Sequence, residues 1–183
     1  MKKCFIAIAA LATLMFASCE KDPIGAAAVE PMAGQWYVQV DGVDTVNNVV
    51  VIEDFNEGRS ILLTYNNAKN DPNRLYINDL GGYLDIIVEV DCDLNSLTFS
   101  SNGEVPNESY PCNVTITNGK IIKNGTTTPS GAKADLIQFD VNFDDDDAAA
   151  IGYPGLTFGE ALGFHVYRVS GWRHTGFGKI IFR

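Results

Sequence analysis

Apolar and polar residues alternate along two stretches, Gly34–Asp41 and, most clearly, Ala134–Phe143. A period of two is typical of a β-strand with one face buried and the other in water. Both stretches are therefore predicted strands. The apolar positions that we expect to face a common core are Trp36, Val38, Val40, Ile137, Phe139, Val141 and Phe143.

Shorter strand-like runs follow one another along the rest of the chain, separated by turn-forming residues. They cover Asn48–Phe55, Ser60–Asn66, Arg74–Asp79, Tyr83–Asp91, Ser96–Ser101, Asn113–Thr117, Lys120–Lys123, Leu162–Ser170 and Gly178–Phe182. Asn118-Gly119 stands between two of these runs and predicts a tight hairpin turn. Only Asp144–Ile151 is a candidate for a short helix. About eight to ten short strands predict an all-β antiparallel sandwich or barrel, and an up-and-down barrel can hold one small apolar ligand.

The first residues have the pattern of an export signal. Met1-Lys2-Lys3 is positive, Phe5–Met15 is apolar and uncharged, and small residues lead to Cys19. The apolar run is short for a membrane span, which indicates a secretory leader. The stretch Glu20–Ala33, rich in Ala, Pro and Gly, is predicted to be a flexible tether.

The end of this leader resembles a bacterial lipoprotein signal. The resemblance implies cleavage before Cys19 and diacylglycerol on its sulfur, so that acyl chains anchor the protein to a membrane. Glu20-Lys21-Asp22 resembles the surface-export signal of Bacteroidota lipoproteins, which implies the outer membrane or the cell surface. The alternative is ordinary secretion with Cys19 as a plain thiol. The expected organisation is a signal peptide at 1–18, a lipidated cysteine and tether at 19–33, and one barrel domain at 34–183.

Charge argues against one class of partner, and the cysteine positions argue against a disulfide. The formal net charge is −10, and removal of Lys2 and Lys3 with the leader makes it more negative by two. Such a chain repels phosphate backbones, so we expect no nucleic-acid partner. Of the cysteines outside the leader region, Cys92 and Cys112 would begin or end strands at opposite ends of a simple meander, which disfavours a disulfide because its Cα atoms must lie within about 7 Å.

Gly34-x-Trp36 on the first strand is similar to the opening motif of lipocalin-like (calycin) barrels. The resemblance implies that Trp36 plugs one end of the barrel and that a late basic residue lies across its ring as a cation–π partner. Arg168, Arg173 and Arg183 are the candidates, and the sequence leaves the choice among them open.

Longer runs resemble the lipid-binding putative hydrolase family of Bacteroidota lipoproteins, over most of 34–177. The resemblance implies a lipocalin-like barrel and a lipid ligand. Trp172 stands where that family usually has histidine. The runs that carry the resemblance are Thr64–Asn66, Leu75–Asp79, Leu97–Ser100, Ile116–Ile121 and Val169–Phe177.

Candidate site residues divide into three groups. Those expected to line an apolar cavity are Trp36, Phe99, Phe139, Val141 and Phe164. Ser170 and His174, placed in a late loop, are the only pair to suggest a hydrolase, and the chain has no Gly-x-Ser-x-Gly nucleophile motif. Asp144–Asp147 could suggest calcium, but adjacent carboxylates point in different directions, so we expect no metal and no cofactor.

The leading functional hypothesis is a lipid-anchored envelope protein that binds a small apolar ligand or lipid inside its barrel without catalysis. The first alternative is a surface interaction or scaffolding lipoprotein with a filled barrel. The second is a hydrolase that uses Ser170 and His174.

Overall fold

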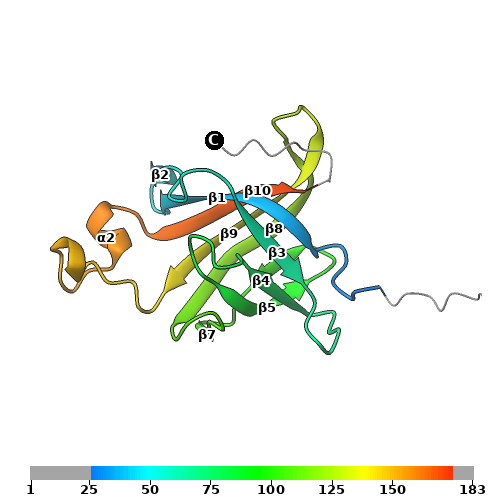
Figure 1. Ribbon diagram of the computed structural model, residues 1–183, viewed down its shortest axis with the longest axis horizontal. Coiled ribbons are helices and arrows are strands. Elements are labelled where there is room, and N and C mark those ends of the chain that lie inside the picture. The colour runs from blue at the N-terminus through cyan, green and yellow to red at the C-terminus, as the bar shows by residue number, and fades with distance from the viewer. Residues whose placement is uncertain (1–25, 175–183) are drawn as a thin grey trace, which may run out of the picture.

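Strands wind around one apolar core in the computed structural model, which describes residues 26–174 (Figure 1). The predicted all-β barrel is confirmed. The strands are β1 (Gly34–Asp44), β2 (Val49–Ile52), β3 (Ser60–Tyr65), β4 (Arg74–Asn78), β5 (Ile87–Asp93), β6 (Thr98–Ser100), β7 (Val105–Pro106), β8 (Asn113–Thr127), β9 (Lys133–Phe143) and β10 (Val166–Arg173). Two short helices, η1 (Ala149–Ile151) and α2 (Phe158–Leu162), lie between β9 and β10.

The barrel closes through a long antiparallel pairing of its first and last strands. β1 pairs with β10 from Trp36 opposite Arg173 to Val43 opposite Val166. Going round the barrel, the order is β10, β9, β8, β6, β5, β4, β3 and β1, which makes eight strands. β2 extends the edge of β1, and β7 pairs with β8. Closure leaves the barrel strands without a free edge, as an up-and-down barrel predicts.

The two ends of the barrel are built differently. At one end, here called the plug end, β1 begins at Gly34 and β10 finishes at Arg173. At the opposite end, here called the loop end, lie the connections 45–59, 79–86, 101–112 and 144–165, which contain β2, β7, η1 and α2. Figure 1 shows α2 and β7 at this end, with residues 26–33 entering from the other end.

Side chains that alternate along the strands fill the barrel. The predicted inward residues Trp36, Ile137, Phe139 and Val141 are all completely buried. Burying one large apolar side chain contributes about 1.5–3 kcal/mol. The alternation therefore has its physical cause in the two faces of each strand, one in the core and one towards solvent.

Asn118-Gly119 does not form the predicted hairpin, because β8 continues through it. The pairing register of β8 with β9 shifts between Thr117 and Lys120, which is a β-bulge. Asn118 adopts the left-handed conformation, with φ of 55°. A Cβ on Gly119 would lie 2.3 Å from the carbonyl oxygen of Phe99 on β6. Glycine is therefore needed at this position because β8 and β6 approach closely, and not because the chain turns.

Two strands start later than predicted because local hydrogen bonds compete with the sheet. Before β10, Thr157 and Glu160 form a reciprocal capping box that starts α2. Before β5, the backbone N–H groups of 84–86 donate to the carboxylate of Asp79. The last residues of β10, Gly171–Arg173, are strand and not loop. Among residues 26–174, no helix has the length and apolar character needed to cross a bilayer.

The end of the expected tether is packed onto the barrel. Val29 and Met32 are completely buried and belong to the hydrophobic core. The packed part of the domain thus begins before Gly34, and this portion of the tether prediction is wrong. The predicted leader, Cys19 and Gly178–Phe182 lie outside the described residues.

Candidate functional site

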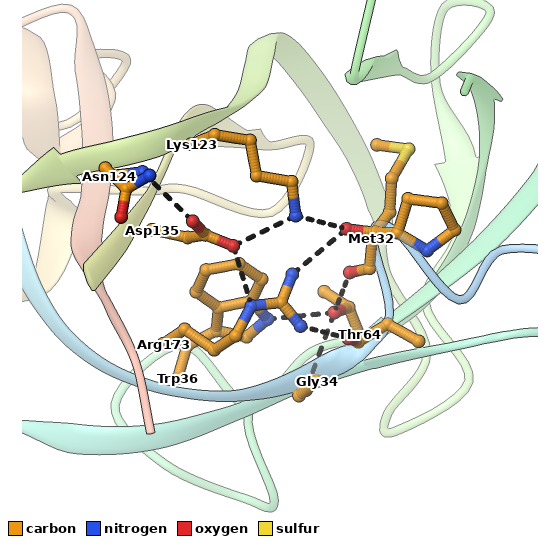
Figure 2. A network of polar contacts seen from close by, with 10 residues as sticks. Met32, Gly34, Trp36, Thr64, Lys123, Asn124, Asp135 and Arg173 are labelled. Carbon is orange, nitrogen blue, oxygen red and sulfur yellow. Dashed lines mark hydrogen bonds and ion pairs between the residues drawn. The ribbon is translucent and has the colours of Figure 1, made fainter. Parts of the chain in front are cut away.

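The plug end is closed by Trp36 and a network of polar contacts around it (Figure 2). The indole Nε1 of Trp36 donates to Thr64 Oγ1 at 2.8 Å, and that hydroxyl donates to the carbonyl oxygen of Met32 at 2.6 Å. The guanidinium carbon of Arg173 lies 4.3 Å from the centre of the Trp36 ring, which is cation–π geometry. The polar side-chain atoms of this network all have partners, which makes the closure around Trp36 rigid.

Arg173 is fixed by groups from two distant parts of the chain. Its Nε donates to Asp135 Oδ2 at 3.1 Å, and its other nitrogens donate to the carbonyl oxygens of Pro31 and Ala33. Lys123 also reaches Asp135, at 3.0 Å. Burial would raise the pKa of Asp135, but the hydrogen bond from the Asn124 backbone and the two cations outweigh it and lower that pKa.

Among the three predicted partners of Trp36, the geometry therefore selects Arg173. Arg168 lies on the outer wall, where its Nε donates to the buried carboxylate of Asp140 at 2.7 Å. Arg183 lies outside the described residues.

All five predicted cavity-lining residues are in the barrel interior, but they pack against other side chains. Phe99 and Phe139 meet edge to face with ring centres 5.6 Å apart. Phe164 contacts Tyr167 in the same way at 5.0 Å. Trp36, Val141 and Phe139 have no exposed surface. None of the five lines the depression described next, so they act as core.

A depression of about 280 Å³ opens at the loop end. Its walls are aromatic on one side and acidic on the other. The lining residues are Tyr83, Leu84, Tyr110, Phe143, Asp145, Asp146, Asp147, Phe158 and Tyr167. The sequence had placed Tyr83, Leu84, Phe143 and Tyr167 in predicted strands but assigned none of them to a site, and Tyr110 and Phe158 were missed altogether. The available signal was that each of these lies in a connection to the same end of the barrel.

The floor of this depression is a cluster of rings around Tyr167. Its ring centre lies 5.9 Å from that of Phe143 and 5.7 Å from that of Phe55. Its hydroxyl donates to Asp146 Oδ1 at 3.3 Å. Burial and then the neighbouring Asp146 raise the pKa of Tyr167, so the phenol stays protonated at neutral pH. Phe55 also stacks on Tyr83, with ring centres 5.6 Å apart.

Two buried polar side chains hold the loops that form the walls. Asp79 accepts three hydrogen bonds of 2.9–3.0 Å from the N–H groups of Leu84, Asp85 and Ile86, which fixes the connection that carries Tyr83. Burial raises the pKa of Asp79, and the three N–H donors act against this rise. Asn107 bridges in turn to the N–H of Ile87 at 2.9 Å and the carbonyl oxygen of Asp85 at 3.0 Å. The depression is thus held in shape by the protein.

The predicted catalytic pair is not brought together. Ser170 lies opposite Gln39 on β1, and the N–H of His174 donates to the carbonyl oxygen of Gln35. Four residues of extended chain separate them by about 13 Å, beyond hydrogen-bonding distance. The ring of His174 packs edge-on against Tyr37 instead, at 4.9 Å. His174 is therefore not placed to act as an activating base for Ser170.

Cysteines and the acidic run lie at the barrel ends. Cys92 and Cys112 are free thiols, as the meander geometry predicted. Within 26–174, ligand atoms of Cys112, Asp144 and Asp145 come within 4.8 Å of one another. The two oxygens of Asp144 already accept hydrogen bonds from the backbone and side chain of Asn113. We therefore interpret Asp144 as a residue that fixes the loop after β9 to the start of β8.

The fold and the site define a closed antiparallel β-barrel that is plugged at one end and hollowed at the other. The model of a family described as lipid-binding putative hydrolase matches residues 21–178. The chain belongs to this family. No curated protein matches it closely enough to count as a relative.

Proposed function

We propose that this protein is a lipid-anchored envelope protein that binds a small apolar ligand or lipid, without catalysis, in the depression at the loop end. The observation that carries the proposal is this depression, with Tyr83, Phe143 and Tyr167 among its walls, next to an interior filled by side chains. The site thus differs from the expected one: the ligand sits at the mouth of the barrel and not deep inside it.

Membership of a lipid-binding family supports the ligand class. The size of the depression is close to the lower limit of small-molecule sites, which is about 300 Å³, so it suits a headgroup and the first part of a chain. The lipoprotein-like leader and Cys19 support an anchor at the outer membrane or cell surface of a Bacteroidota cell. The absence of contact between Ser170 and His174 supports binding over hydrolysis by that pair.

A neutral fluorescent probe, N-phenylnaphthylamine, tests the site in the purified full chain. Tyr83→Asp places a charge on the wall of the depression, and we expect it to weaken probe binding at least tenfold. Ile122→Asp is the matched control, because Ile122 is 42% exposed, close to the 45% of Tyr83, but lies on β8 away from the loop end. Equal affinity of the two variants would place the probe elsewhere.

The filled interior also favours the alternative of a surface interaction lipoprotein, because completely buried Trp36, Phe139 and Ile137 leave the barrel centre no role but packing. Failure of the unchanged chain to bind the probe, together with an absence of copurified lipid by native mass spectrometry, would support this second function.

A further inference from the structure

The chemistry of the depression indicates more than an apolar ligand. Three tyrosines (Tyr83, Tyr110 and Tyr167) line it together with three consecutive aspartates, 145–147, and its lining contains no arginine or lysine. The face of an aromatic ring attracts a cation, and aspartate side chains are ordinarily ionised at neutral pH. Rings and carboxylates around one small volume together favour a positively charged group.

The surroundings of the depression have the same sign of charge. Among the described residues, the loop-end segments 45–59, 79–86, 101–112 and 144–165 contain twelve aspartates and glutamates and, as basic residues other than histidine, Arg59 alone. The guanidinium of Arg59 lies on the outer wall, 4.2 Å from the Trp172 ring centre. The negative charge of the loop end therefore attracts an approaching cation and repels an anionic headgroup.

The same loops also expose apolar side chains. Of the eleven large hydrophobic residues exposed among 26–174, ten lie in these loop-end segments, and Ile122 is the exception. Val46 is 80% exposed and Leu80 is 56% exposed. Exposed apolar side chains that gather at one place mark a binding surface. They give an alkyl chain that emerges from the depression a surface on which to lie.

We propose that the depression is selective for cationic amphiphiles, that is, molecules with an amine or quaternary ammonium headgroup on an apolar chain. This rests on the proposed function and specifies its ligand class. The headgroup lies among the tyrosine rings and the carboxylates of Asp145 and Asp146, and the chain runs over the apolar loop-end side chains. Anionic lipids are disfavoured because nothing in the lining neutralises their charge.

Isothermal titration calorimetry on the full chain tests this with three probes of equal chain length, each below its micelle concentration: decyltrimethylammonium, decanol and decyl sulfate. We expect decyltrimethylammonium to bind at least tenfold more tightly than decanol, and decyl sulfate to bind more weakly than decanol. The preference should shrink as salt rises, since salt screens exposed charges.

The variant Asp145→Asn/Asp146→Asn removes two charges with little change of shape. We expect it to reduce the ammonium preference to about threefold or less while decanol affinity stays within twofold. The matched control, Asp71→Asn/Asp93→Asn, removes one charge between β3 and β4 and one at the last residue of β5, both at the plug end, and should leave the preference intact.

The outcomes separate the inference from the proposed function. Equal binding of decanol and decyltrimethylammonium overturns the cationic selectivity and leaves an apolar site. A preference that survives in the Asp145→Asn/Asp146→Asn variant also overturns the assignment to these carboxylates. Binding of none of the three probes overturns both proposals.

Discussion

The plug end and the loop end of this barrel differ in how their charged and apolar side chains are arranged. At the plug end, Trp36, Arg173 and Asp135 close the barrel with polar atoms that have partners and charges that compensate. At the loop end, carboxylates far outnumber basic side chains, and apolar side chains lie in water. Uncompensated charge and exposed apolar surface both cost stability. Under the proposed function, we therefore expect the plug end to contribute most to stability and the loop end to provide the binding site.

Trp36→Ala should give the largest effect on stability. Removing a fully buried tryptophan leaves a cavity and deprives Thr64 and Arg173 of their partner, so we expect a loss of about 3–5 kcal/mol in the free energy of unfolding. Urea unfolding measures it. Trp172→Ala on the outer wall is the control and should cost about 1 kcal/mol or less. Similar losses for both variants would show that the plug is not a special source of stability.

Asp79→Ala should lower both the stability and the probe affinity moderately, because Asp79 is a buried residue of the loop end. Three N–H groups lose their acceptor, which should cost about 1–3 kcal/mol. The connection that carries Tyr83 also becomes mobile, and we expect N-phenylnaphthylamine to bind about threefold to tenfold more weakly, measured by fluorescence titration. A stability loss with unchanged probe affinity would contradict the role of Asp79 in shaping the depression.

The smallest effect concerns pH at the plug end. The pKa of Asp135 is lower in the folded protein, so its ionised form contributes stability above the unfolded-state value of about 3.9, and this contribution is lost as pH falls through the folded-state value. The difference in unfolding free energy between the unchanged chain and Asp135→Asn should shrink as the pH falls from 6 to 3. A difference independent of pH would mean that the carboxylate gains nothing from Lys123 and Arg173.

Much of the fold could be predicted from residues alone, because strand alternation has a local cause. Val38, Phe139 and Val141 face the core as their period indicates. Asn118-Gly119 was misread because the same dipeptide suits a hairpin turn and a bulge, and only the approach of Phe99 from another strand distinguishes them. Val29 and Met32 were assigned to a tether because two isolated apolar residues show no periodicity, although the open barrel end supplies the surface that buries them.

The site was less predictable because it depends on contacts between residues that are far apart in the sequence. Trp36 was found through its motif, but the choice of Arg173 over Arg168 depends on which face of β10 each occupies and on Asp140, which pairs with Arg168. The depression is formed by Tyr83, Tyr110 and residues of β9 and β10, which only closure of the barrel brings together. Neither sequence spacing nor composition contains that information.

The burial of Val29 and Met32 has a consequence for how the molecule stands on a membrane. If Cys19 carries the proposed acyl chains, six residues lie between the acylated cysteine and Ala26, and the seven Cα-to-Cα steps between these two residues reach at most about 25 Å. The plug end would then be held close to the bilayer, and the acidic loop end would face away from it. In that arrangement the depression would take its ligand from the surrounding medium and not from the leaflet that holds the anchor.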